Sequence, residues 1–143
     1  MNTKIPVAIL GATGMVGQKF ITLLADHPWF EITALAASEK SAGQSYAEAI
    51  GARWMQDAQI PEHIKNVRVY DAIHDMSAIA GISRLVFSAI DADIETIQKL
   101  EIAYATIGLA VVSNNSAHRS TQDVPMIIPE INPYEPLTFG ILT

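Results

Sequence analysis

Three glycines spaced three residues apart constrain this chain more than any other feature. They lie in the stretch VAILGATGMVGQKFITLLADHP, where Gly11, Gly14 and Gly17 separate an apolar run from an amphipathic segment. The apolar run predicts a strand over Val7–Leu10, and apolar residues at three- and four-residue steps predict a helix over Met15–His27. In such a unit the first glycine permits a tight turn, the second lets a phosphate approach the backbone, and the third lets the helix lie close to the strand.

The start of this helix is suited to the pyrophosphate of a dinucleotide. Its first N–H groups point toward an anion, and the helix dipole adds to the attraction. Thr13 adds a hydroxyl donor. The residues expected to bind the pyrophosphate are Gly11, Thr13, Gly14, Met15, Val16 and Gly17. The alternative is that the glycines only form a tight strand-to-helix connection, because a spaced-glycine motif alone is a weak signal.

Short β-branched runs alternate with helical stretches along the chain, which is typical of a parallel sheet built from βαβ units. Strands are expected at Val7–Leu10, Glu31–Ala37, Val67–Tyr70, Leu85–Ala89, Ala110–Ser113 and Met126–Ile128. The segment 38–66 shows no clear periodicity and stays unassigned. With 143 residues, 50% of them hydrophobic, the chain is long enough for one core. The sequence predicts one α/β domain over residues 1–143, a Rossmann-type, doubly wound, mainly parallel sheet with helices on both faces.

Two helices carry apolar stripes that predict their buried faces. The stripe of the first is formed by Val16, Phe20, Leu23, Leu24 and His27, and Pro28 ends that helix. A second helix is expected over Ala92–Ala105, before Gly108, with Asp91 or Asp93 as its N-cap. Its inward residues are expected to be Ile94, Ile97, Leu100 and Tyr104.

Composition excludes several other classes of function. A net charge of −6 and a pI near 5.0 argue against general attraction to nucleic acid or to anionic lipid. The apolar run Pro6–Leu10 is too short for a secretory signal or a membrane span, so a cytoplasmic protein is expected. The chain has no cysteine, and its four histidines show no ligand spacing, so we expect no metal site.

The end of the second predicted strand indicates which dinucleotide is bound. A site selective for NAD usually carries a carboxylate there for the ribose hydroxyls. This chain reads AASEKSAG, which places Ser38, Lys40 and Ser41 where the 2′-phosphate of NADP would lie. Glu39 would oppose a phosphate and is expected to point to solvent. The alternative is a solvated polar loop without a ligand.

Five stretches, GATGMVGQKF, LAASEKSAG, LVFSAID, VVSNNSAHR and VPMIIPEINP, resemble in order and spacing the aspartate-semialdehyde dehydrogenases, most closely the archaeal and fungal branch. The resemblance covers nearly the whole chain. It implies an NADPH-dependent enzyme that reduces aspartyl 4-phosphate to aspartate semialdehyde and phosphate, on the route to lysine, threonine and methionine. It also implies an N-terminal Rossmann domain, a following catalytic and dimerising domain, and a homo-oligomeric full-length protein.

The resemblance implies further site residues. Ser88 and Ala89 would lie under the cofactor, and Asn114 would lie near the nicotinamide or the substrate. Arg119 resembles the arginine that holds the substrate's phosphate, a task suited to a planar fork of donors. The alternatives are ordinary polarity at strand ends and a solvated arginine. No role is expected for His118, which would be a surface residue.

The family's nucleophile has no counterpart here. The family uses a cysteine thiolate in an Asn-Pro-Asn-Cys sequence after a strand that resembles the terminal Phe139–Thr143. We therefore expect no catalytic residue among these 143 residues, and an isolated cofactor-binding domain that is inactive alone. Three alternatives stay open: a malonyl-CoA reductase, an N-acetyl-glutamyl-phosphate reductase, against which SNNSAHR argues, and a non-enzymatic NADP-binding module.

Overall fold

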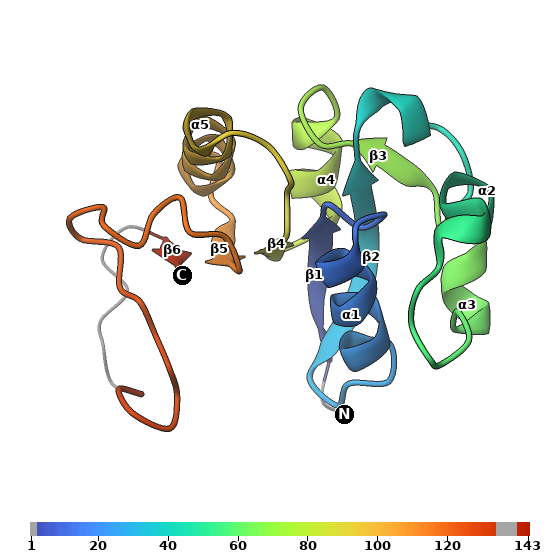
Figure 1. The fold of residues 1–143 in the computed structure, drawn as a ribbon, viewed down its shortest axis with the longest axis horizontal. Coiled ribbons are helices and arrows are strands. Elements are labelled where there is room, and N and C mark those ends of the chain that lie inside the picture. The colour runs from blue at the N-terminus through green and yellow to red at the C-terminus, as the bar shows by residue number, and fades with distance from the viewer. Residues whose placement is uncertain (1–2, 134–139) are drawn as a thin grey trace.

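The computed structural model describes residues 3–133 and 140–143 (Figure 1). Its centre is a six-stranded sheet in the order β3-β2-β1-β4-β5-β6, in which all neighbouring strands run parallel. The strands are β1 (Ile5–Leu10), β2 (Phe30–Ala37), β3 (Val69–Asp71), β4 (Leu85–Ser88), β5 (Ala110–Ser113) and β6 (Ile141–Leu142). The helices are α1 (Met15–Leu24), α2 (Tyr46–Ile50), α3 (Glu62–Lys65), α4 (Met76–Ile82) and α5 (Ile94–Thr106), with 3₁₀ turns η1 (Glu39–Ser41) and η2 (Gly51–Arg53).

The strand order reverses between β1 and β4. The chain runs outward from β1 to β2 and β3, then crosses to β4 and continues to β5 on the other side. Leu10 at the end of β1 is level with Ser88 at the end of β4. Ligands of doubly wound sheets bind outside the carboxyl ends of the strands at this point. In Figure 1 the turn between β1 and α1 lies at this edge.

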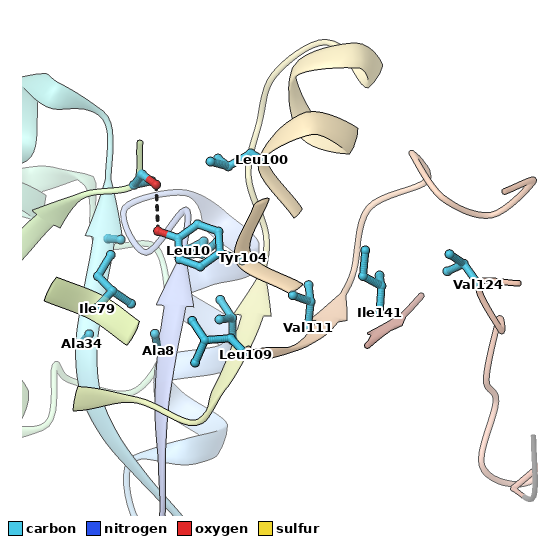
Figure 2. Close-up of a cluster of buried hydrophobic side chains, with 13 residues drawn as sticks. Ala8, Leu10, Ala34, Ile79, Leu100, Tyr104, Leu109, Val111, Val124 and Ile141 are labelled. Atoms are coloured by element: carbon cyan, nitrogen blue, oxygen red, sulfur yellow. Dashed lines mark hydrogen bonds between the residues drawn. The ribbon is translucent and has the colours of Figure 1, made fainter. Parts of the chain in front are cut away.

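Helices cover both faces of the sheet, as the sequence predicts. Successive side chains of β1 point to opposite faces, as the pleat of a strand requires. Ala8 and Leu10 join a cluster with Ile79 of α4 and Tyr104 of α5 (Figure 2). On the opposite face, Val7 and Ile9 pack with side chains of the other three helices, among them Ile21, Leu24, Tyr46, Ile50 and Ile64. The predicted doubly wound, parallel α/β architecture is confirmed.

The expectations for α5 are mostly confirmed. Asp93 is its N-cap and accepts a hydrogen bond from the backbone N–H of Thr96 at 2.9 Å. The buried residues are Ile97, Leu100, Glu101 and Tyr104. Ile94 was expected to face inward, but it is 59% exposed. As the first residue after the cap, it precedes the turns that pack on the sheet.

The predicted buried stripe of α1 is partly wrong. The helix ends at Leu24, three residues earlier than predicted, and its buried residues are Gly17, Gln18, Ile21 and Leu24. Val16 is 40% and Leu23 59% exposed. The reason is that Gly17 lies against the backbone of the preceding turn, and this contact sets the face that α1 turns inward.

The predicted strand at Met126–Ile128 is also wrong. The N–H of Ile127 donates to the carbonyl of Thr143 at 2.9 Å, and the N–H of Thr143 donates to Pro125 at 3.1 Å. These two bonds form no ladder, because Pro125 and Pro129 bracket the segment and lack N–H donors. The sixth strand is β6, within the expected terminal strand, of which Phe139 lies outside the described residues.

The unassigned segment 38–66 consists of short elements. α2 begins with a capping box in which Ser45 and Glu48 exchange hydrogen bonds. The hydroxyl of Tyr46, in the first turn of α2, is buried and donates to the carbonyl of Ala12 at 2.8 Å. This bond connects α2 to the glycine-rich turn, although its two residues are 34 positions apart in the sequence.

Candidate functional site

Two of the three glycines are required by sterics. Gly11 has a φ of +76°, and a Cβ there would overlap the carbonyl of Ala89 at the end of β4. A Cβ on Gly17 would overlap the carbonyl oxygen of Gly11 and lie 2.8 Å from the Cα of Ala12. The turn therefore packs simultaneously against the neighbouring strand and against α1.

The third glycine is exposed and has room for a side chain. Gly14 is the N-cap of α1, and no side chain caps this helix. The nearest protein atom to a Cβ built on Gly14 is the carbonyl oxygen of Gly11, at 3.4 Å. The side chains of Met15 and Val16 are exposed, so these residues would offer their backbone N–H groups. An uncapped helix start with free space in front of it is suited to bind an anion.

A cavity of about 440 Å³ lies at this edge of the sheet. From the sequence-predicted residues it brings together Gly11, Thr13, Gly14, Ser38 and Ala89. Its wall also contains residues that the sequence did not single out for the site, namely Ala37, Arg53, Asp71, Ala72, Ile73, His74, Ile90, Ala92, Thr96 and Leu100. Asp91, considered as a helix cap, lines it as well. The cavity thus runs from the glycine-rich turn to the ends of β2 and β3.

The loop after β2 contributes to this cavity differently from the expectation. Ser38 and Glu39 line it, and Glu39, which was expected to point to solvent, is exposed. Lys40 is exposed but does not line the cavity. Ser41 is only 6% exposed, because the 3₁₀ turn η1 folds it inward, with its N–H donating to Ser38 at 2.9 Å. Of the three residues predicted to bind the 2′-phosphate, only Ser38 therefore lines the cavity. The carboxylate of Glu39 is its neighbour in the sequence.

Arg53 supplies a cation that the sequence analysis missed. Its backbone is held by Gln18, which is buried in α1. The side-chain Nε2 of Gln18 donates to the carbonyls of Thr13 at 3.2 Å and Arg53 at 3.0 Å. Its Oε1 accepts from the N–H of Met55 at 2.7 Å. Gln18 thereby ties the loop after η2 to the glycine-rich turn.

A carboxylate and a histidine lie at the end of β3. Oδ1 of Asp71 accepts from the N–H groups of Ile73 and His74, and Oδ2 lies 3.1 Å from Nδ1 of His74. Burial opposes the ionisation of Asp71, but the hydrogen bonds from His74 and Ile73 lower its pKa. The hydrogen bond that the His74 ring donates to Asp71, together with the negative charge of Asp71, raises the pKa of His74. The pair therefore favours a carboxylate and an imidazolium at the cavity wall.

The other predicted site residues lie elsewhere. Asn114 and Arg119 line a second cavity, of about 610 Å³, beside the end of β5. Ser88 lines neither cavity, because it is fully buried and its hydroxyl accepts from Nδ2 of Asn115 at 3.3 Å. The structure therefore places Asn114 and Arg119 on a different cavity from the glycine-rich turn.

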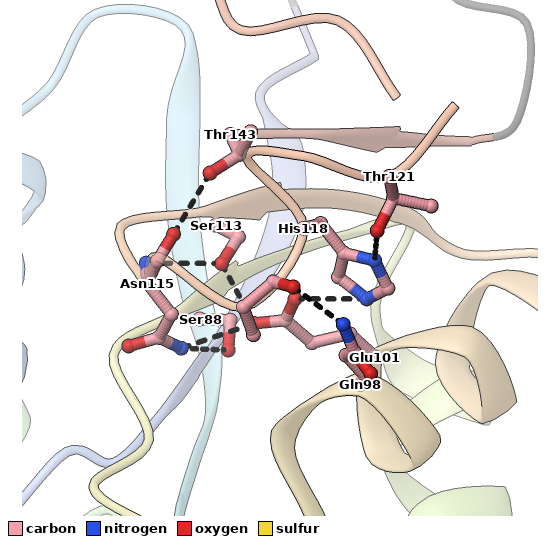
Figure 3. A network of polar contacts seen from close by, with 9 residues as sticks. Ser88, Gln98, Glu101, Ser113, Asn115, His118, Thr121 and Thr143 are labelled. Atoms are coloured by element: carbon pink, nitrogen blue, oxygen red, sulfur yellow. Dashed lines mark hydrogen bonds and ion pairs between the residues drawn. The ribbon is translucent and has the colours of Figure 1, made fainter. Parts of the chain in front are cut away.

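A buried polar network adjoins this second cavity through Ser113, which lines the cavity and belongs to the network (Figure 3). It joins Glu101 of α5 to Ser113, Asn115 and His118. His118, expected at the surface, is only 1% exposed. Glu101 lies three residues after Gln98 on α5. A buried glutamate leaves no mark in the hydrophobic periodicity of a helix, so the sequence could not show that Glu101 is buried.

Other kinds of site are not evident in the described part of the chain. None of its helices has the length and apolar character needed to cross a membrane. Across residues 3–133 and 140–143, no three His, Cys, Asp or Glu side chains come together in an arrangement that could hold a metal ion.

Known proteins are similar to this chain over most of its length. The family described as "Semialdehyde dehydrogenase, NAD binding domain" matches residues 6–137. The aspartate-semialdehyde dehydrogenase of Archaeoglobus fulgidus is 43% identical over 127 residues, covering 89% of this chain and 35% of the relative. A malonyl CoA reductase (NADP) of Metallosphaera sedula is 36% identical over 134 residues, covering 94% of this chain and 35% of the relative.

A solved structure agrees with the fold. The aspartate-semialdehyde dehydrogenase of Candida albicans, solved with NADP, superposes with a TM-score of 0.82 at 38% identity, over 92% of this chain and 35% of the other. The chain thus spans about a third of the length of these relatives. On the family match, the parallel sheet and the glycine-rich turn, the chain belongs to the semialdehyde dehydrogenase family and corresponds to its NAD-binding domain.

Proposed function

We propose that this chain is the cofactor-binding part of an aspartate-semialdehyde dehydrogenase. Such an enzyme reduces aspartyl 4-phosphate with NADPH to aspartate semialdehyde and phosphate, on the route to lysine, threonine and methionine. The observation that carries the proposal is the uncapped helix start behind Gly14, which opens on a cavity at the switch point of the sheet. Relatives that carry the enzyme's name support it.

The residues present fit a dinucleotide. The first-turn N–H groups of α1 and the hydroxyl of Thr13 would hold the pyrophosphate, in the space that Gly14 leaves free. Ser38 would hold the adenosine ribose or its phosphate, and Ala89 would lie under the cofactor. When bound, NADPH supplies the hydride for the reduction. The chain's own part is to hold and orient the cofactor at the edge of the sheet.

The substrate side of the proposal rests on the second cavity. Arg119 is exposed on its wall with Asn114, and a guanidinium can hold a phosphate through two parallel hydrogen bonds. Asn114 offers an amide next to it. In this proposal Arg119 orients the acyl phosphate of the substrate or the departing phosphate, while Asn114 lies between substrate and cofactor.

A turnover assay tests the proposed activity. The 143 residues contain no cysteine, so this chain has no thiolate that could attack an acyl phosphate. We expect no NADP reduction with aspartate semialdehyde and phosphate by the chain alone, and turnover by a protein extended to the length of the relatives. Turnover by the 143-residue chain would contradict the placement of the nucleophile outside it.

A malonyl-CoA reductase is the second candidate, because a relative with that name is 36% identical to this chain. The same extended protein separates the two. Reduction of malonyl-CoA in preference to aspartyl phosphate would favour the second candidate, and cofactor binding without turnover of either would favour a non-enzymatic module. We further propose that the full-length protein is a homo-oligomer, which sedimentation of the extended protein would test, and that it is cytoplasmic, which cell fractionation would test.

NADP is proposed as the preferred cofactor, because Ser38 and Lys40 follow β2. Lys40 is exposed beside Glu39, and its flexible stem leaves the ammonium free to approach a phosphate at the cavity mouth. Lys40→Ala is expected to weaken NADP⁺ binding about tenfold and to leave NAD⁺ binding unchanged. Calorimetry measures both affinities.

The matched control is Lys4→Ala, which removes an exposed lysine just before β1, at the opposite edge of the sheet. It is expected to change neither affinity. Equal binding of both cofactors by the unaltered chain would refute the NADP preference, and in that case Glu39 would be assigned to the ribose hydroxyls.

A further inference from the structure

Glu101 is an acidic side chain with no exposure to solvent, and its carboxyl group lies beside the ring of a buried histidine, His118. It lies on the buried side of α5, among residues of the hydrophobic cluster such as Leu100 and Tyr104. Burying a carboxylate is costly unless its oxygens are bonded. The contacts of its two oxygens therefore indicate what the residue does.

The first oxygen organises the end of β5. Oε1 accepts from the hydroxyl of Ser113 at 2.7 Å and from Nδ2 of Asn115 at 3.0 Å. The hydroxyl of Ser113 in turn accepts from the backbone N–H of Asn115 at 3.0 Å. These three bonds fix the residues on either side of Asn114, which lines the second cavity.

The second oxygen faces His118. Oε2 lies 3.6 Å from Nε2 of His118, and neither atom has a hydrogen-bond partner. The other ring nitrogen of His118 lies 3.1 Å from the hydroxyl of Thr121. Gln98, one turn before Glu101 on α5, donates to the carbonyl of Ala117 at 2.6 Å. The residue that follows His118 is Arg119.

The network therefore contacts the neighbours of both candidate substrate-binding residues, but neither residue itself (Figure 3). We propose that Glu101 is a positioning residue, whose buried carboxylate holds the loop 113–121 so that Asn114 and Arg119 face the second cavity. The proposal rests on the proposed function of Arg119 as the phosphate-binding residue.

The test compares substrate kinetics in a protein extended to the length of the relatives. Glu101→Leu removes both oxygens and is expected to raise the KM for phosphate about tenfold or more, because the guanidinium is no longer held in place. Glu101→Gln keeps an acceptor for Ser113 and Asn115 and is expected to recover most of that loss. NADPH affinity is expected to stay within about twofold in both variants, because the first cavity is untouched.

The control for simple destabilisation is Ile79→Ala, which opens a cavity in the same hydrophobic cluster on α4. Denaturant unfolding of each variant allows comparison at equal stability. If Ile79→Ala raises the KM for phosphate as much as Glu101→Leu does, the carboxylate has only a structural role and the proposal is overturned. Should Glu101→Leu not fold, Ser113→Ala removes two of the three bonds, the one to Glu101 and the one from the N–H of Asn115, and is expected to raise the same KM.

Arg119→Ala, measured in parallel, separates the two proposals. If it raises the KM for phosphate and the Glu101 variants do not, positioning by Glu101 is refuted and the role of Arg119 stands. If Arg119→Ala itself has no effect, the proposed role of Arg119 fails, and the positioning role fails with it. Cofactor binding and reduction would remain untouched by that result.

Discussion

Gly17→Ala is expected to reduce dinucleotide affinity by about a hundredfold or more. The added Cβ would overlap the carbonyl oxygen of Gly11 and the Cα of Ala12, both of which are backbone atoms that cannot turn aside. α1 must then move away from the turn, and its first N–H groups lose their positions. Overpacking of this kind costs about 1 to 3 kcal/mol of stability, measurable by denaturant unfolding beside a calorimetric titration of NADPH.

The matched control is Gly81→Ala in α4. A Cβ there meets no atom within 4 Å, so alanine is accommodated. Because alanine is the better helix former, this variant is expected to gain about 0.5 to 1 kcal/mol and to bind cofactor normally. Normal cofactor binding by Gly17→Ala would mean that the close approach of α1 to the turn is not what builds the site.

Arg119→Ala, in a protein extended to the length of the relatives, is expected to raise the KM for phosphate or aspartyl phosphate about a hundredfold. The loss of a charged, bidentate contact to a desolvated phosphate costs about 2 to 4 kcal/mol. NADPH affinity is expected to stay nearly constant, because Arg119 lies on the second cavity and the glycine-rich turn on the first. Steady-state kinetics in the phosphate-dependent direction measure the KM for phosphate, and calorimetric titration measures the NADPH affinity.

Arg84→Ala is the control for the loss of one exposed arginine. Arg84 directly precedes β4, at the amino edge of the sheet and on a different surface hollow. Its removal is expected to leave the KM for phosphate unchanged. An effect of Arg119→Ala smaller than about threefold, little more than an exposed charge pair contributes, would mean that Arg119 is an ordinary solvated residue.

Short stretches of sequence were enough to predict the glycine-rich turn and the start of α5. Gly11 and Gly17 identified the turn because a side chain at either position would strike backbone. Asp93 was one of two residues predicted as the N-cap of α5, because it comes directly before a segment whose apolar residues have helical spacing. Periodicity failed at Val16 and Leu23, since an apolar side chain on the surface of a helix carries the same signal as a buried one.

Contacts between distant segments could not be predicted. Gln18 holds Arg53 across 35 residues of sequence, and no local pattern marks either residue. The sequence likewise gave no reason to place Asp71 and His74 beside Ser38, since only the pairing of β3 with β2 brings their loops to one cavity. The resemblance gave Asn114 and Arg119 as candidate site residues, but it did not point to the buried glutamate that contacts their neighbours.

The dinucleotide site itself is tested most directly by titrating NADPH into the 143-residue chain while following the backbone amide signals by NMR. We expect saturable one-to-one binding, with the largest shifts in residues 11–17, in residues 38–41 and in residues 89–92, around the first cavity. The absence of saturable binding would contradict this expectation. Shifts centred instead on Pro6 and Arg84, at the opposite edge of the sheet, would contradict it as well.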